Sequence, residues 1–391
     1  MKWNWQQSEW PDFSWQASRL AKAEEQFLLH SGRFLGTVQH LGQDDRDMLI
    51  VESMSNEAMT TSEIEGEILN RDSVQSSIRR QLGLAADHRK VLPAEQGIGE
   101  MMVDLYRNFA APLDPNTLFN WHRMVTSGRT DLRDIGRYRT HPEPMQVVSG
   151  RIYDPKVHFE APPSDRVPEE MDRFIAWFNR TAPGGSNPLG VVTRAGLSHI
   201  YFESIHPFED GNGRIGRAIA EKVIAQSLGQ PSLTAIAATI LAHRSDYYTE
   251  LEAANKGNEV TNWLAWFAGI ALEAQAMTLA QVEFLIEKTK LLDRFRDQLN
   301  ERQKAVLLRV LREGPSGFKG GLSAGNYVSI AKTSPATAGR DLSEMVGMGV
   351  LHRTGEKRHT RYHLPFPLRP VPRITITADG SVRTEPLPRI S

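Results

Sequence analysis

The sequence predicts a mainly helical protein that carries one small β-hairpin and ends in a separate helical domain. Three observations predict this. Apolar residues recur at helical spacing over most of the chain, including both sides of a glycine-rich loop at 206–217. Strand-like alternation is concentrated in 136–163. A series of short predicted helices, the last opened by a Ser-Pro pair, follows residue 300.

Composition sets the broad class. The 391 residues are enough for two or three domains with a sizeable core. With 40% hydrophobic and 24% charged residues and a net charge of −1, the chain is typical of a soluble globular protein, and the overall balance does not indicate a membrane partner. It has no cysteine, which excludes disulfides and thiolate metal sites and suits the reducing cytoplasm. The N-terminus has no signal-peptide pattern, so we expect a cytoplasmic protein.

The N-terminal region, residues 1–85, begins with clustered aromatic side chains: Trp3, Trp5, Trp10, Phe13 and Trp15. We expect these rings to pack back on the main domain, although a dimer contact is the alternative because tryptophan is also common at partner surfaces. A helix is expected from Trp15 to Leu29. Helices over 44–83 are interrupted near Gly66, which can end a helix in the left-handed conformation. Glu65 then lies at a helix end whose dipole disfavours a carboxylate, which indicates a cationic partner elsewhere.

The segment His206–Arg217, HPFEDGNGRIGR, lies between two apolar-periodic stretches and is expected to form a loop between two helices. Glycines 211 and 213 let the backbone approach a ligand closely. The first amides of the second helix, with its dipole, favour an anion there. Backbone groups at Gly211 and Gly213 and the Asn212 side chain could hold an α-phosphate, while Arg214 and Arg217 could bind the β- and γ-phosphates.

Two further side chains of this segment indicate chemistry. Asp210 offers a hard oxygen for Mg²⁺, which usually binds through one or two carboxylates and substrate phosphates. His206 is the group whose ordinary pKa suits a base near neutral pH. A base that accepts a proton from a hydroxyl beside a bound α-phosphate implies nucleotidyl transfer from ATP, with pyrophosphate as the leaving group.

This segment resembles the motif of the Fic family, H-P-F-x-D/E-G-N-G-R-x-x-R, at every defined position. Fic proteins mostly transfer AMP from ATP to a hydroxyl side chain of a protein target. The resemblance therefore implies an all-helical Fic catalytic core, here 86–299, and a protein adenylyltransferase that uses ATP and Mg²⁺. Fic relatives that move phosphate carry a lysine where this chain has Gly211, so the resemblance favours AMP transfer. The family often forms dimers, which makes a homodimer one state to expect.

The tract Thr61–Gly66 resembles the Fic inhibitory motif, S/T-x-x-x-E-G/N, with Thr61, Glu65 and Gly66 at the defined positions. In that family the glutamate pairs with the second arginine of the main motif, here Arg217, and blocks the γ-phosphate. Its position before the main motif resembles the subgroup with an N-terminal inhibitory helix. Glu63 and Glu67 lie close by, so the assignment of inhibition to Glu65 rests on the resemblance.

Segments on either side of the motif complete the predicted core. Met145–Tyr153, with a turn expected at Ser149-Gly150, resembles the β-hairpin flap that Fic domains place over the active site, where an edge can hold a target segment by main-chain pairing. The alternative is a surface hairpin without a partner. After the motif, a short helix is expected over 235–242. Tyr248 and Asn255 resemble residues near the adenine, with core packing as the alternative. A long helix from 272 to 299 closes the core.

Residues 300–364 resemble a winged helix-turn-helix, with helices at 301–312, 324–331 and 334–348 and a wing at 351–363. Over 301–364 there are eleven Lys and Arg residues against five Asp and Glu. A basic face on this fold is typical of duplex DNA binding, and protein contacts are the alternative. The remaining stretch, 365–391, is a proline-rich tail or an added hairpin.

Three functions remain open on the sequence alone. The first is a protein adenylyltransferase inhibited by Glu65 against Arg217, whose target has a Ser, Thr or Tyr hydroxyl. The second runs the same site in reverse as a de-AMPylase, with Glu65 orienting a water. The third is a DNA-binding regulator whose Fic core senses nucleotide. An intact His206 favours the enzyme, because sensing alone needs no base.

Overall fold

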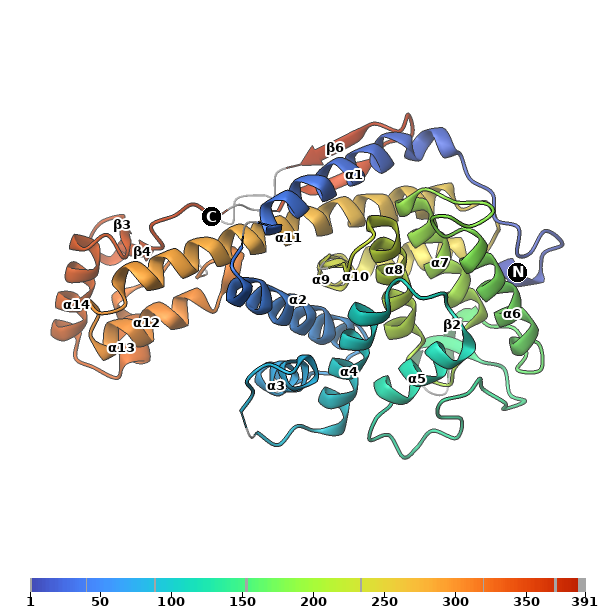
Figure 1. Cartoon of the computed structure of the whole chain (residues 1–391), viewed down its shortest axis with the longest axis horizontal. Coiled ribbons are helices and arrows are strands. Elements are labelled where there is room, and N and C mark those ends of the chain that lie inside the picture. The colour runs from blue at the N-terminus through green and yellow to red at the C-terminus, as the bar shows by residue number, and fades with distance from the viewer. Residues whose placement is uncertain are drawn as a thin grey trace. The chain divides into compact units, whose positions relative to one another are not determined.

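The structure is a computed structural model that describes residues 2–39, 41–87, 89–151, 154–232, 234–318, 320–368 and 371–385. Within these ranges the protein is mainly helical, and its strands form two-stranded antiparallel hairpins. The chain divides into two compact units (Figure 1). The first contains the residues up to 275 together with 373–385, and the second contains 276–372. The predicted fold class, mainly α, is confirmed.

The first unit is built from helices around two buried helices, α7 and α8, whose bounds are given below. Its elements are a 3-10 turn (Asn4–Gln6), α1 (Ala17–Gln39), α2 (Gln43–Ile64), α3 (Arg71–Leu82), α4 (Pro93–Asn108), α5 (Pro115–Val125), β1 (Gln146–Arg151), β2 (Asp154–Glu160), α6 (Val167–Arg180), α7 (Val191–Ile205), α8 (Asn212–Leu228), α9 (Ile236–Ala242), α10 (Arg244–Ala254), the first part of α11 (Thr261–Phe295), β5 (Arg373–Ile376) and β6 (Val382–Glu385).

Helix α7 is the centre of this unit. All of its residues are buried, and α1, α6 and α8 pack against it. A helix that is buried on every side has no solvent face, which explains why the sequence 191–205 is apolar with little amphipathic pattern. Helix α8 is buried over most of its length as well. The loop that joins the two helices is therefore held on a rigid support.

The N-terminal aromatic residues pack back on this unit, as predicted. The indole N–H of Trp5 donates to the backbone oxygen of Glu160 at 2.7 Å, and that of Trp10 donates to the carboxylate of Glu170 at 2.9 Å. Buried residues of the region up to 85, such as Phe27 and Ile78, belong to the same hydrophobic core as α7. The expected 1–85 region is thus not a separate packing unit. Helix α1 also continues to Gln39, well beyond the expected end at Leu29.

The β1–β2 hairpin forms within the expected stretch, but its turn lies elsewhere. The expected turn residues are paired within the ladder, Ser149 with Lys156 and Gly150 with Pro155. The connection between the strands, 152–153, falls outside the described residues. Alternation alone does not fix which residues turn, because a Ser-Gly pair also fits an exposed strand. The expected turn at Ser149-Gly150 was therefore wrong.

Helix α11 is continuous from Thr261 to Phe295, whereas the sequence predicted a helix from 272 to 299. Gly269 lies inside the helix rather than at a break. A Cβ at that position would lie 2.5 Å from the backbone oxygen of Ile374 in β5. The glycine therefore permits close packing of the β5–β6 hairpin against α11. This hairpin is the added hairpin that the sequence suggested within 365–391.

The second unit has its own hydrophobic core. It contains the second part of α11, three further helices and a hairpin. Its elements are α12 (Glu301–Leu311), α13 (Ala324–Ala331), α14 (Pro335–Gly347), β3 (His352–Thr354) and β4 (Arg361–His363). Ser334 accepts a hydrogen bond from the Thr337 N–H, and Pro335 occupies the first helical position of α14. Among the described residues, no helix is sufficiently long and apolar to span a bilayer.

Candidate active site

The loop between α7 and α8 is shaped by two left-handed residues. His206 ends α7 with φ 50°, and Gly211 precedes α8 with φ 84°. A Cβ at Gly211 would lie 2.9 Å from Cγ2 of Val125, so both the backbone and the space require glycine. Helix α8 begins at Asn212, and the N–H groups of its first turn have no intrahelical acceptors. The loop therefore ends at a helix terminus with free N–H groups, at the place where the sequence predicted an anion.

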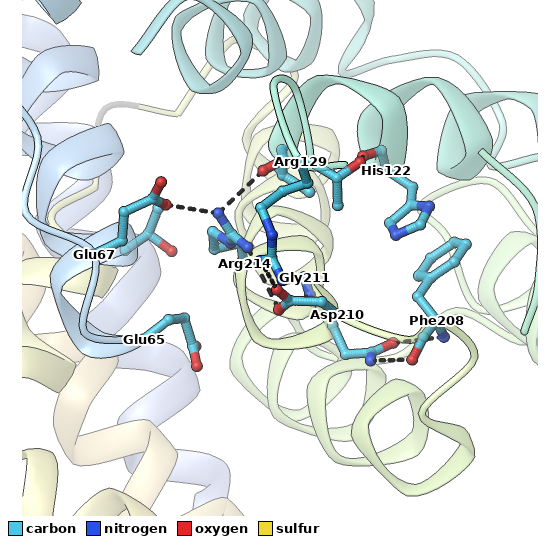
Figure 2. A network of polar contacts seen from close by, with 12 residues as sticks. Glu65, Glu67, His122, Arg129, Phe208, Asp210, Gly211 and Arg214 are labelled. Atoms are coloured by element: carbon cyan, nitrogen blue, oxygen red, sulfur yellow. Dashed lines mark hydrogen bonds and ion pairs between the residues drawn. The ribbon is translucent and has the colours of Figure 1, made fainter. Parts of the chain in front are cut away.

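Asn212 has a different task from the one expected. Its Nδ2 donates to the backbone oxygen of Phe208 at 2.8 Å, and its Oδ1 accepts from the Phe208 N–H at 3.0 Å (Figure 2). The side chain is buried and braces the loop, so the expected contact between its amide and an α-phosphate is not supported by this geometry. Phe208 in turn stacks on His122, whose Nδ1 accepts from Gly136 N–H at 2.9 Å. His122 is therefore a packed residue.

His206 is held in the form that can accept a proton. Its side chain is 14% exposed, and its Nδ1 lies 3.6 Å from Oε2 of Glu203. Burial, followed by the charge of Arg139, lowers the pKa of His206 to about 4. Arg139 is itself fixed, because its Nε donates to the backbone oxygen of His206 at 2.8 Å. At neutral pH the imidazole is therefore uncharged.

Asp210 is ionised and reachable from solvent. Burial disfavours its charged form, but Arg214, Arg129 and the Gly211 N–H together lower its pKa below the ordinary value. Arg129 pairs with Oδ2, Gly211 N–H donates to Oδ1 at 2.5 Å, and Arg214 lies 3.5 Å from Oδ1. A charged, partly exposed carboxylate beside an anion-binding loop is the donor set that Mg²⁺ takes together with phosphates, so the residues fit this ion.

Arg214 is surrounded by acceptors (Figure 2). Its Nη1 donates to Glu67 at 2.8 Å and to the backbone oxygen of Val125 at 3.1 Å. The Arg214 side chain is only 6% exposed, whereas that of Glu67 is 37% exposed. An anion that replaced the more exposed Glu67 would find the guanidinium already positioned.

Arg217 is bound by the end of α2. Its Nε donates to Oγ1 of Thr61 at 2.7 Å, and its Nη2 donates to the Thr61 backbone oxygen at 2.9 Å and to Oε1 of Glu65 at 2.6 Å. The structure therefore brings together Thr61, Glu65 and Arg217, which are far apart in the sequence. Gly66, with φ 86°, follows Glu65 and turns the chain away.

Glu65 also lies against the loop itself. A Cβ at Gly213 would lie 2.2 Å from Oε1 of Glu65. The carboxylate therefore lies beside the first turn of α8. Its side chain is 32% exposed, so it covers this place from the solvent side.

Tyr248 and Asn255, the two residues expected near an adenine, lie in different environments. Tyr248 lies beside the end of α2, where its hydroxyl donates to the backbone oxygen of Ile64 at 3.3 Å, and it is 40% exposed. Asn255 is buried, and its side chain accepts from Ser204 Oγ at 3.2 Å while its backbone oxygen accepts from Asn4 N–H at 2.8 Å. Asn255 therefore anchors the N-terminal segment, and the expectation of a place near the adenine is not supported for it.

Sequence reasoning assigned no partner to three charged residues of this site. Arg129 pairs with Asp210, Glu67 pairs with Arg214, and Glu203 lies beside His206. Glu203 had a local signal, because residues three apart on a helix lie on one face. Arg129 had none, since its partner is distant in the sequence.

Two known protein families match parts of the chain. Residues 112–224 match the Fic/DOC family, and residues 3–84 match the "Domain of unknown function (DUF4172)" family. The chain contains a Fic/DOC family domain. That Fic domain includes the loop, His206, both motif arginines and Arg129, whereas Glu65 and Glu67 belong to the preceding matched region.

Curated relatives of the Fic domain carry the name protein adenylyltransferase. "Protein adenylyltransferase Fic" of Drosophila grimshawi is 36% identical over 199 residues, covering 50% of this chain and 37% of the relative. "Protein adenylyltransferase fic-1" of Caenorhabditis elegans is 25% identical over 172 residues, covering 44% and 30%. The chain thus spans about a third of the length of these relatives.

Solved structures share the fold. A Fic domain containing signaling protein from Bacteroides thetaiotaomicron superposes with a TM-score of 0.50 at 17% identity, covering 67% of this chain and 97% of that one. A single-residue variant of Fic-1 from C. elegans gives a TM-score of 0.50 at 17% identity, covering 68% and 74%. These matches agree with the mainly helical Fic fold described above.

Proposed function

We propose that this protein is an adenylyltransferase that moves AMP from ATP to a hydroxyl side chain of a protein target. The observation that carries the proposal is a largely buried, uncharged His206 at the start of the loop that carries Asp210, with Arg214 and Arg217 on the helix that follows. A base next to a triphosphate site suits attack of a hydroxyl on phosphorus. The names of the relatives of the Fic domain support the same reaction.

Each residue of the site is proposed to have its own role in the reaction. Because Nδ1 of His206 faces Glu203, Nε2 is the ring nitrogen left to accept the proton of the target hydroxyl. The hydroxyl oxygen then attacks the α-phosphorus, and pyrophosphate leaves. The amides at the start of α8 stabilise charge that develops on the α-phosphate. Asp210 would hold Mg²⁺, which supplies charge neutralisation to the phosphates when bound.

The target is proposed to lie along the β1–β2 hairpin. The exposed side chains of the hairpin include three valines, at 147, 148 and 157. A two-stranded hairpin has free strand edges that can pair with an extended segment through main-chain hydrogen bonds. Such pairing would align a hydroxyl without reading much sequence.

We further propose that Glu65 inhibits this reaction. Its carboxylate binds Arg217, the residue proposed to hold the γ-phosphate, and it lies against Gly213 in the space that the phosphate would need. Tyr248, whose hydroxyl contacts the same end of α2, is proposed to lie beside the adenine. Incubation of the Glu65→Gly variant with ATP labelled at the α-phosphate tests the whole proposal, because transfer predicts label on protein together with release of pyrophosphate.

AMP removal is a second candidate for the same site. The observation that favours it is the 32% exposure of the Glu65 side chain, which leaves that carboxylate accessible to a water near the loop. Loss of AMP from a previously labelled target, in wild type but not in Glu65→Gly, would support removal. Retention of the label in both would count against it.

A separate candidate function, duplex DNA binding, is favoured by the charges of the second unit. Most of its acids bind neighbours within the unit, such as Asp341 with Arg302 at 3.0 Å and Glu344 with Gln303 at 3.0 Å. By contrast, no acidic ion-pair partner occurs, within the described part of the chain, for the exposed basic residues of the α13–α14 turn, α14 and the β3–β4 hairpin: Lys332, Arg340, Arg353, Lys357 and Arg358.

The exposed face of helix α14 is proposed to fit the major groove of duplex DNA. Its buried side chains are Ala338, Asp341, Leu342 and Met345. The opposite face presents small residues, Ala336, Gly339 and Ser343, around Arg340. Because these side chains are short, the helix backbone could approach base edges closely in a major groove, while the hairpin contacts phosphates.

Removing hairpin charge is expected to weaken DNA binding and its salt dependence. For the full chain and a mixed-sequence duplex, replacement of both Arg353 and Lys357 by alanine should reduce the slope of log affinity against log salt by about 1 for each phosphate that is no longer neutralised. Arg309→Ala is the matched control, because Arg309 pairs with Glu313. Fluorescence anisotropy at several salt concentrations measures this, and equal slopes in all three proteins would contradict DNA binding through the hairpin.

A further inference from the structure

Glu203 is a buried acid close to the proposed base. It lies one helical turn before His206 on α7 and is 5% exposed. Its Oε2 is 3.6 Å from Nδ1 of His206, and its Oε1 has no hydrogen-bond partner in the described structure. Burying a carboxyl group with an unused oxygen costs free energy. An apolar side chain at this position would avoid that cost, so packing alone does not account for Glu203.

Gly216 makes the space for this carboxyl group. A Cβ at Gly216 would lie 2.5 Å from Oε1 of Glu203 and 3.2 Å from Nδ1 of His199. Gly216 lies inside α8 and is not among the glycines with positive φ, so its backbone does not require glycine. Glycine inside a helix is less favourable than alanine. The helix thus loses stability at the place that accommodates Glu203.

We propose that Glu203 is a positioning residue for His206. The inference rests on the proposed adenylyl transfer and deepens it. The carboxyl group faces Nδ1, so the ring presents Nε2 to the target hydroxyl. When the hydroxyl proton moves to Nε2, a buried imidazolium forms, and the nearby Glu203 carboxylate stabilises that charge.

The groups around Glu203 connect it to the inhibitory contact. The titratable and charged side chains that interact with it or lie beside it come from α7, α8, α10 and the end of α2: His199, His206, Arg217, Tyr247 and Glu65. Burial, and after it the charge of Glu65, raises the pKa of Glu203 to about 8, while Arg217 opposes the rise. Departure of Glu65 therefore frees Arg217 and also favours the ionised form of Glu203.

Replacing the carboxyl group by an amide tests the inference. In the Glu65→Gly background, Glu203→Gln should lower kcat by roughly 10²-fold, the size typical of losing one group that stabilises transition-state charge. The KM for ATP should change little, because within the described structure the ion pairs of Arg214 and Arg217 are with other acids, and Glu203 forms none with them. In the parent, which lacks the negative charge of Glu65, kcat should rise with pH as Glu203 ionises, at a pH below the region of 8, and the variant should lose this rise.

A second variant controls for misfolding. In Glu203→Ala combined with Gly216→Ala, the new methyl group at 216 takes part of the space that the carboxyl group leaves. This protein should keep the thermal midpoint and ATP affinity of its parent yet show the low kcat of Glu203→Gln. A Glu203→Gln protein with the kcat and pH profile of its parent would overturn the inference.

Failure of the inference and failure of the proposed function give different results. If the Glu65→Gly parent transfers no AMP, the proposed function fails. The role of Glu203 is then decided by ¹⁵N NMR of His206 in the nucleotide-free protein. We expect the ring to be protonated at Nδ1 in the parent and to become a mixture of both tautomers in the double alanine variant. Identical tautomer populations in the two proteins would contradict the inference.

Discussion

Glu65→Gly is expected to increase AMP transfer by roughly tenfold to a hundredfold. This estimate corresponds to losing one charge-assisted hydrogen bond, about 1.5–3 kcal/mol, that ATP would otherwise have to displace. The variant frees Nη2 of Arg217 from Oε1 of Glu65 and clears the space beside Gly213. The initial rate of α-labelled AMP incorporation, at saturating Mg²⁺ and equal protein concentration, measures the effect.

Glu63→Gly is the matched control for this prediction. Glu63 is exposed on the last turn of α2, so its replacement removes the same charge and introduces the same flexible residue. It should leave the low rate of wild type nearly unchanged. Equal activation by both substitutions would assign the effect to loosening of α2, and the inhibitory contact proposed for Glu65 would have to be abandoned.

His206→Ala in the Glu65→Gly background is expected to lower transfer by about 10²- to 10⁴-fold, the range typical of losing a general base. ATP binding should persist, because Arg214, Arg217 and the amides at the start of α8 do not depend on the imidazole. Isothermal titration with ATP and the labelling assay separate these effects. The backbone of His206 has φ 50°, so a small loss of thermal stability is also expected.

His141→Ala serves as the control for the histidine substitution. His141 lies in the segment before β1, and its Nδ1 is 3.0 Å from the backbone oxygen of Glu143. Its replacement should leave kcat unchanged. Loss of ATP binding in His206→Ala would show that the ring supports the loop rather than the chemistry, and retained transfer would exclude it as the base.

Much of the candidate site could be predicted from the sequence because its main parts are local. His206, Asp210, Gly211 and the two motif arginines lie within one short segment, whose glycines and helix start indicate an anion site without knowledge of the fold. The second local signal, at Thr61 to Gly66, rested on a family resemblance. Its contact with Arg217 is long-range, and the structure supplies it.

Other features depend on packing that no local pattern records. Asn212 was expected at a phosphate, but its amide matches the free N–H and C=O of Phe208, and such a match is visible only once the loop is closed. Gly269 lies before the predicted start of the long helix at 272, whereas in the structure it lies inside α11 and permits the close approach of β5. Glycine signals either a turn or a close contact, and only the fold decides between them.

Comparison of two positions of the label tests the central claim most directly. The Glu65→Gly protein, incubated with Mg²⁺ and a protein mixture, is given ATP labelled either at the α-phosphate or at the γ-phosphate. The account predicts protein-bound label from the α-position alone, and none from either position when His206→Ala is added. Label transferred from the γ-phosphate, or no label from either position although ATP binds, would contradict it.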